Sequence, residues 1–142
     1  MNTFLTDTEM ASLVEAIKTA EDCSTGEIRI HIDSNTEGDN AERAFAVFKS
    51  LCKDQTAEKN AVLFHVNFER QYLTIIGDEG IHKKVHQYFW DHMHDKVTAE
   101  FSKKKYFEGL KNAILETGEE LKKHFPITGE NPNELPNEIT FS

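Results

Sequence analysis

A predicted β-hairpin between residues 60 and 80 constrains the fold of this 142-residue chain more than any other segment. Two apolar runs, 61–66 and 72–76, flank the short polar turn 67–70. The first run is apolar apart from His65, which is typical of a strand that is buried on both faces. Two such strands joined by a short turn pair antiparallel, so the chain must contain a β-sheet.

The other periodic segments predict one further strand and four helices. Residues 27–33 alternate, with isoleucines on one face, as expected for a strand. Thr6 and Glu9 have the spacing of a capping box, which indicates where the first helix begins. Apolar residues at helical spacing predict the helices at about 7–21, 41–53, 81–101 and 106–124.

This order of elements indicates an α/β fold with a small mixed sheet. The connection from the first to the second strand contains a helix, so these two strands should be parallel and the crossover right-handed. The third strand should return antiparallel through the hairpin. Helices would then cover both faces of the sheet.

Composition and charge exclude several classes of protein. The formal net charge of -9 argues against a nucleic-acid-binding protein, because phosphate contacts need a basic surface. It also disfavours docking on an anionic membrane. No segment reaches the roughly 18 apolar residues of a membrane span, and the N-terminus lacks the pattern of a signal peptide. With only two cysteines and no CxxC spacing, we expect the reducing cytoplasm as the compartment. We also expect the chain to be a monomer.

The last residues differ in composition from the rest of the chain. Residues 126–142 contain three prolines, three glutamates and no basic residue, without helical or strand periodicity. Such a segment has no apolar face to bury and does not recover the entropy lost on ordering. We therefore predict one domain over residues 1–125, followed by a flexible acidic tail over residues 126–142.

The predicted topology places several oxygen-bearing side chains at one edge of the sheet. Asp78 and Glu79, between Gly77 and Gly80, follow the third strand, while Asn60 precedes the second strand. Glycines there allow a positive φ and a close approach of the backbone.

Glu27, at the start of the first strand, should reach the same edge. Carboxylate and amide oxygens suit a hard cation, so Asp78, Glu79, Asn60 and Glu27 are the candidate ligands for Ca²⁺ or Mg²⁺. A solvated turn, with acids that favour the N-terminus of the next helix, would give the same pattern. The pattern alone does not separate the two readings.

The seven histidines and the hydroxyl residues give weaker indications. His82 and His86 have the i, i+4 spacing of a helical metal-binding pair, but no HExxH motif or cysteine accompanies them. The rings of His92 and His94 would point in different directions on a helix. The sequence contains no GxSxG, P-loop or GxGxxG motif, so the catalytic residues, if any exist, are unknown.

Four segments resemble the motifs of the TPM domain family, from about Glu9 to Phe125. The segments are TGEIRI at 25–30, NAVLFHV at 60–66, YLTIIGDEGI at 72–81 and YFEGL at 106–110. They are similar to the family patterns TG(A)EI, DNGVLL, GYGLEG and GDYxxGL. In the second motif Asn60 is kept, whereas Lys59 and Ala61 replace the aspartate and the glycine.

The resemblance implies a Rossmann-like three-layer sandwich and, in some members, a divalent cation near these edge motifs. Plant members of the family are associated with acid phosphatase activity and photosystem repair. From this we expect a stand-alone TPM-like domain that binds a divalent cation and interacts with a protein partner not identified by the sequence. The alternative is a metal-assisted phosphomonoesterase, which would need a metal-bound water or a nucleophile.

Overall fold

The computed structural model describes residues 5–22, 24–34, 37–127 and 137–142. Its elements agree closely with the periodic segments of the sequence, and the capping box of Thr6 and Glu9 is formed at the first helix. In chain order they are α1 (Asp7–Glu21), β1 (Glu27–Asp33), α2 (Asn40–Leu51), β2 (Ala61–Asn67), β3 (Tyr72–Gly77), α3 (Glu79–Ser102), α4 (Tyr106–His124) and β4 (Thr140–Phe141).

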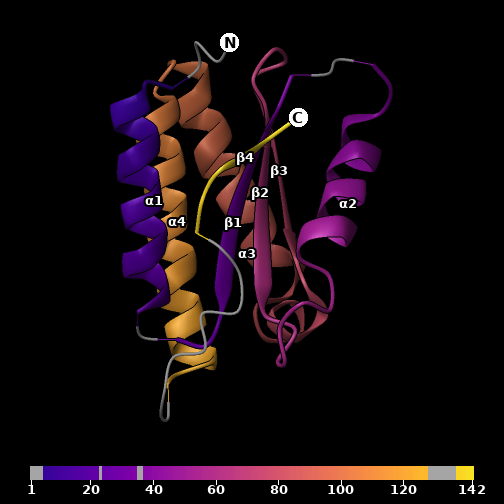
Figure 1. The fold of residues 1–142 in the computed structure, drawn as a ribbon, viewed down its shortest axis with the longest axis vertical. Helices are drawn as coiled ribbons and strands as arrows, with labels where there is room; N and C mark the ends of the chain where they lie inside the picture. Colours follow the sequence, from indigo (N-terminus) through magenta and orange to yellow (C-terminus); the bar gives the residue numbers. More distant parts are fainter. Residues whose placement is uncertain (1–4, 23, 35–36, 128–136) are drawn as a thin grey trace.

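The sheet is mixed and has the strand order β3-β2-β1-β4. β1 and β2 are parallel, and β2 and β3 are antiparallel, as predicted. Helices cover both faces, so the predicted three-layer α/β sandwich is confirmed (Figure 1). Helices α1, α3 and α4 lie on one side of the sheet and α2 lies on the other. Within the described residues, no helix is both long and apolar enough to cross a bilayer.

The two faces of the sheet differ in polarity. Ile28, Ile30 and Ile32 of β1 point into the large core beneath α1, α3 and α4. Beneath α2, only a small apolar cluster forms around Phe48 and Leu63, and it includes the buried Cys52. The rest of that face is polar yet buried: every residue of β1 and of β2 is buried. Polar groups in such a layer need partners inside the protein.

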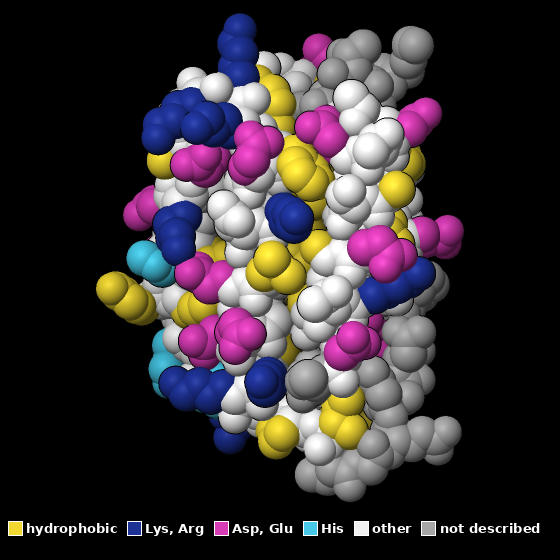
Figure 2. Space-filling model, turned by 90° about the vertical axis from the view of Figure 1, so that its left-hand side faces the viewer, with side chains coloured by type: hydrophobic (Ala, Val, Ile, Leu, Met, Phe, Trp, Pro, Cys, Tyr) yellow, Lys and Arg dark blue, Asp and Glu magenta, His cyan; other side chains and the backbone are white. Residues whose placement is uncertain are grey.

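The exposed side of helices α1 and α4 carries charges of both signs. In Figure 2, which shows this side, acidic and basic side chains are interspersed, with hydrophobic side chains between them. A mixed surface of this kind is usual for helices that face water.

The end of the chain corrects the predicted domain boundary. Thr140–Phe141 pairs with β1 in parallel, opposite His31 and Ile32. Ser142 accepts a hydrogen bond from the Ser34 amide (2.9 Å) and donates its own amide to the Ile32 carbonyl (3.0 Å). The prediction of a flexible tail is therefore wrong for these last residues, because backbone pairing with an open strand edge needs no side-chain periodicity. Residues 128–136 of the predicted tail lie outside the described part of the chain.

Helix α3 packs very closely on the end of β3 and is broken early. A Cβ atom on Gly77 would lie 2.3 Å from the ring of Trp90, so only glycine fits there. His86 interrupts the helix with φ 63° and ψ 175°. This break means that His82 and His86 are not one turn apart on a regular helix. The Nδ1 atom of His82 accepts a hydrogen bond from the Trp90 indole instead (3.0 Å).

Candidate functional site

The backbone brings the predicted ligand positions to one edge of the sheet. Glu27 is in register with Ala61, and Val62 with Gly77, so β1 and β2 begin where β3 ends. The Asp78 amide donates to the Ala61 carbonyl (2.9 Å). The predicted convergence of these segments is thus confirmed at the level of the main chain. We call this edge, together with the loop 53–59, the rim.

Asp78 fixes the loop of the rim to the start of α3. One of its carboxylate oxygens, Oδ1, accepts from the amide of Glu79 (2.8 Å), and the residue is the N-cap of the helix. The other oxygen, Oδ2, accepts from the amide of Asp54 (2.9 Å). Asp78 is only 2% exposed. Its carboxylate therefore positions two segments of the rim, and both oxygens are already engaged.

The glycines of the rim allow a close approach, as predicted, but not a positive φ. A Cβ on Gly80 would lie 2.0 Å from the Glu58 carbonyl oxygen. The Gly80 and Ile81 amides both donate to the Lys59 carbonyl (2.8 and 3.2 Å). Gly77 and Gly80 do not have positive φ; in the rim, Asp54 and Lys59 adopt it, at 57° and 52°. The first amides of α3 are therefore bonded to the protein itself.

Asn60 is buried in a network that holds the loop before β2. Its side-chain oxygen accepts from the Thr56 hydroxyl (2.9 Å), and its side-chain amide donates to the Thr25 hydroxyl (3.1 Å). The Thr25 hydroxyl in turn donates to Glu58. Every polar atom of this side chain has a protein partner. Asn60 thus shapes the rim from inside.

Glu27 pairs with another acid rather than with Asp78. Both Glu27 and Glu21 are buried, and their carboxyl groups are hydrogen-bonded to each other. Glu21 also accepts from the Ile28 amide (2.7 Å). Burial above all, with the nearby Glu27 carboxylate as a further cause, raises the pKa of Glu21 to about 9. At neutral pH this pair therefore holds a proton.

The exposed carboxylates of the rim are those of Glu58, which accepts from the Thr25 hydroxyl, and of Asp54 and Glu79, which form ion pairs with lysines. The two that form ion pairs, Asp54 and Glu79, share one lysine. The ammonium group of Lys59 lies between them, 3.5 Å from Asp54 Oδ1 and 3.8 Å from Glu79 Oε2. The ammonium group of Lys53 lies 4.0 Å from the second carboxylate oxygen of Glu79, Oε1. All four side chains of these ion pairs are at least one-third exposed. The rim thus gathers carboxylates around a cationic group in contact with water.

Oxygen donors of this kind suit a hard divalent cation, but they are few. In the described part of the chain, no three His, Cys, Asp or Glu side chains are grouped so that they could hold a metal ion. The structure therefore brings the main chain of the four predicted residues together without bringing their free oxygens together. A bound cation would need water or carbonyl oxygens to complete its shell.

A second polar cluster lies at the opposite end of β1, beneath α2. Two atoms of the Arg43 guanidinium, Nε and Nη2, donate to the two oxygens of Asp33 (2.8 and 2.9 Å). His65 Nε2 lies 3.2 Å from Asp33 Oδ2, and its ring stacks on that of His31 at 5.8 Å. Asp33 and His65 are fully buried. We call these four residues the buried cluster.

The buried cluster is tied to β4. The two ring nitrogens of His31 lie 2.6 Å from the hydroxyls of Thr140 and Ser142. Burial, reinforced by the nearby His65, lowers the pKa of His31 to about 4, and burial also lowers that of His65. Both rings are therefore neutral at pH 7. A cavity of about 900 Å³ lies between α2 and β4 beside this cluster.

Comparisons with known proteins indicate the relatives of this chain. The TPM domain matches residues 1–120. The NMR structure of the BA42 protein from the psychrophilic bacterium Bizionia argentinensis is 35% identical, with a TM-score of 0.89, and the match covers 100% of this chain and 98% of that one.

Two more distant structures share the fold. The N-terminal domain of a protein from P. gingivalis has 15% identity and a TM-score of 0.70, with 89% of this chain and 84% of that one covered. The N-terminal domain of the cg2496 protein from Corynebacterium glutamicum has 11% identity and a TM-score of 0.65, with 82% and 74% covered. Among curated proteins, no significant match was found.

Proposed function

This chain belongs to the TPM domain family, and we propose that it acts as an interaction module that binds Ca²⁺ or Mg²⁺ at the rim. The observation that carries the proposal is the position of the Lys59 ammonium between the carboxylates of Asp54 and Glu79. A site that already attracts one cation from two sides favours a divalent ion by the same electrostatics. The lysine is a competitor that the ion must displace.

The residues of the rim divide into two roles in this proposal. Asp54 and Glu79 are the accessible ligands, because their side chains are about half exposed or more. Asp78 and Asn60 hold the loops that present these ligands, because their own atoms are engaged in hydrogen bonds. Glu27 does not contact the ion in this proposal, because its carboxyl group is paired with that of Glu21. Affinity should be modest, on the order of 10⁻⁴–10⁻³ M, because few carboxylates converge.

The proposal is tested by a calcium titration followed by amide shifts. We expect Ca²⁺ to perturb the amides of Asp54, Lys59 and Glu79 before all others. The double variant Asp54→Asn plus Glu79→Gln should weaken binding by about tenfold or more, since it removes both carboxylates that pair with Lys59. The matched control is Asp91→Asn plus Glu119→Gln, which makes the same charge change on α3 and α4. Equal weakening in both double variants would mean that Ca²⁺ binds only to the diffuse negative charge.

We do not propose the phosphomonoesterase alternative as the function. A helix N-terminus binds phosphate through free amide donors, and at the start of α3 the amides of Glu79, Gly80 and Ile81 already donate to protein oxygens. Turnover of p-nitrophenyl phosphate by highly purified protein should therefore be negligible with Mg²⁺, Ca²⁺ or Mn²⁺. A rate that survives repurification and disappears in Asp54→Asn plus Glu79→Gln would restore that alternative.

A further inference from the structure

The strand β3 forms an open edge of the sheet. In the strand order β3-β2-β1-β4 of the described residues, it pairs with β2 on one side and with no strand on the other. Most of its residues are half-buried, whereas β1 and β2 are buried throughout. Charged residues and prolines usually protect such an edge from pairing with another strand, and the segment Tyr72–Gly77 contains neither. Its outward backbone groups are thus available to another strand.

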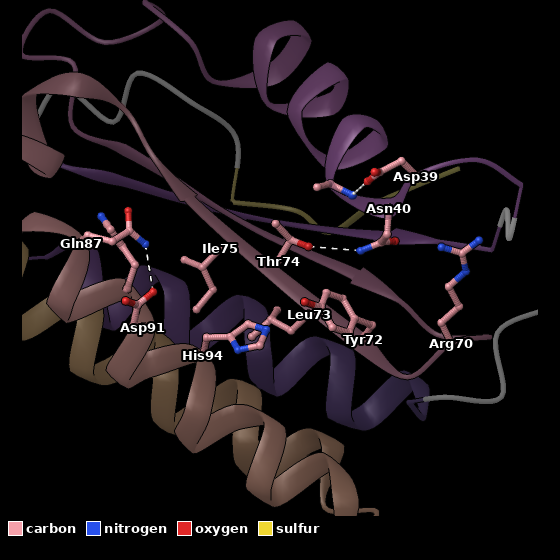
Figure 3. Close-up of a pocket in the computed structure, with 12 residues that line it drawn as sticks. Asp39, Asn40, Arg70, Tyr72, Leu73, Thr74, Ile75, Gln87, Asp91 and His94 are labelled. Carbon is pink, nitrogen blue, oxygen red and sulfur yellow. Dashed lines mark hydrogen bonds between the residues drawn. The ribbon is translucent and has the colours of Figure 1, made fainter.

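A slot runs along this open edge, between the two helical layers. It has a volume of about 430 Å³ and is lined by the start of α2, the middle of β3 and one side of α3 (Figure 3). Asn40 and Ala41 border it on the α2 side, and Gln87, Trp90 and Asp91 border it on the α3 side. This is the place that a fifth strand would occupy beside β3 in a three-layer sandwich. The volume is in the range of ligand-sized cavities.

We propose that this slot binds an extended peptide segment of a partner protein, which adds to β3 as a strand and carries basic side chains. Binding of this kind takes its affinity from backbone hydrogen bonds and its specificity from the pockets that receive alternate side chains. The proposal goes beyond cation binding at the rim and does not depend on it.

Asn40 offers an acceptor that the protein itself leaves without a hydrogen bond. Its side-chain amide donates to the Thr74 hydroxyl on β3 (3.1 Å), and Figure 3 shows the two side chains facing each other beside the slot. The Oδ1 atom of Asn40 is buried and has no hydrogen-bond partner among the described residues. A buried acceptor without a partner costs free energy, which a donor on an incoming peptide would recover once the Asn40 side chain turns toward the slot.

The two layers give the alternate side chains of a bound strand different surroundings. Side chains that point toward α3 would meet Trp90 and the carboxylate of Asp91, whereas those that point toward α2 would meet Ala41 and Asn40. On the side that faces α3, these contacts favour a branched apolar residue and, two residues away on the same face, a basic one. On the side that faces α2, they favour small polar residues such as threonine.

Charge decides between a basic partner and a second copy of this chain. Among the described residues, no basic side chain lies within 4.0 Å of the carboxylates of Asp39 or Asp91. The guanidinium of Arg70 donates to the Gly38 carbonyl (3.1 Å). In a symmetric pairing of two β3 edges, each copy would bring the same lining to the interface, with the acidic side chains of Asp39 and Asp91 against the one arginine, Arg70. A basic segment instead supplies the opposite charge.

The test uses the whole chain and a defined peptide. The probe is the N-acetylated, C-amidated heptapeptide TKTVTKT, which carries its lysines and valine on one face and its threonines on the other, added to ¹⁵N-labelled protein. We expect shifts of the amides of residues 73–75, the Asn40 side chain and the Trp90 indole. A peptide of the same sequence with alternate backbone amides methylated should bind at least about tenfold more weakly, because it cannot pair with a strand. The acidic peptide TETVTET should also bind more weakly.

A pair of variants locates the binding. Gln87→Trp fills the slot from the exposed side of α3 and should weaken binding about tenfold, whereas Lys83→Trp, on the same helix outside the slot, should not. The proposal is overturned if the peptide causes no shifts at millimolar concentration, or if the methylated peptide binds equally well. Growth of the apparent mass with protein concentration that Gln87→Trp abolishes would show a second copy in the slot, which also contradicts a basic partner.

Discussion

The rim and the buried cluster both pair carboxylates with basic side chains, but in opposite environments. At the rim, Asp54 and Glu79 face the ammonium groups of Lys59 and Lys53 at 3.5 to 4.0 Å, in contact with water. In the buried cluster, Asp33 is fully enclosed and accepts two hydrogen bonds from Arg43.

The cationic group at the rim can be exchanged for another cation, whereas that of the buried cluster cannot. A flexible lysine in water contributes little to stability and is easily displaced. A guanidinium with two hydrogen bonds to a buried carboxylate is costly to remove, because the carboxylate would be left without a partner. Binding chemistry is therefore expected at the rim, and structural dependence at the buried cluster.

The largest effect is expected from the substitution Asp33→Asn. The variant keeps the shape of the side chain but leaves Arg43 and His65 without their carboxylate. We expect the free energy of unfolding to fall by about 3 kcal/mol, as for other broken buried ion pairs. Urea denaturation followed by circular dichroism measures it. A loss as small as that of an exposed pair would show that the buried cluster is not structural and that the contrast with the rim is wrong.

A smaller effect is expected at Glu21, which lies near the rim but is buried. The pKa of its carboxyl is raised from its ordinary value of 4.5 to about 9, so this group's contribution to stability is complete below pH 4.5 and declines as the pH rises toward 9. Glu21→Gln is permanently neutral and can still accept from the Ile28 amide. Near pH 8 we expect it to raise the free energy of unfolding by about 1–2 kcal/mol.

The measurement for Glu21→Gln is urea denaturation of both proteins at pH 5 and pH 8. The gain should nearly vanish at the lower pH, where the wild-type carboxyl is less costly. A gain that is the same at both pH values would show that the carboxyl does not hold a proton in the folded state. In that case burial would not explain why the rim and the buried cluster behave differently.

The pH dependence on the acid side tests the buried cluster. The pKa of His31 is lowered from 6.5 to about 4, so the unfolded chain takes up a proton in this interval that the folded protein does not. Stability from this group is complete above pH 6.5 and is lost as the pH falls toward 4, with a slope of up to about 1.4 kcal/mol per pH unit. His31→Gln should reduce the slope of stability against pH in that window. An unchanged slope would mean that His31 titrates normally.

The sequence predicted the periodic part of the fold and the backbone of the rim. Alternation in 27–33 and the apolar hairpin determined which strands pair, and the pairing placed Glu27, Asn60 and Asp78 at one edge. β4 was missed because a two-residue strand has no period, and its contacts lie more than a hundred residues away along the chain. Pairing over such distances is decided by the assembled sheet.

The side chains of the candidate sites were harder to predict than the main chain. The Asp54–Lys59–Glu79 grouping depends on the positive φ of Asp54 and Lys59, which no residue type in the loop demands. The contacts of Arg43 and His65 with Asp33 depend on how α2 packs over the sheet. Asp78 and Asn60 were placed correctly, but sequence alone does not show that their oxygens already have protein partners.

The smallest effect on stability is expected from Glu79→Gln in the absence of metal. This carboxylate is exposed and its two lysine partners are 3.8 and 4.0 Å away. The free energy of unfolding should change by less than about 0.5 kcal/mol. Urea denaturation in the presence of a chelator measures it. A loss comparable to that of Asp33→Asn would place Glu79 in the structure rather than in a binding site.

The calcium affinity of Lys59→Asp tests the central claim most directly. The change removes the competing ammonium and places a third carboxylate between Asp54 and Glu79, at a position with positive φ that aspartate tolerates. The matched control is Lys111→Asp, which makes the same charge change on α4, beside the start of α1. By calorimetric titration, the account predicts that Lys59→Asp binds Ca²⁺ at least about tenfold more tightly than the wild type, and Lys111→Asp within about twofold. Equal affinities for the two variants would contradict a cation site at the rim.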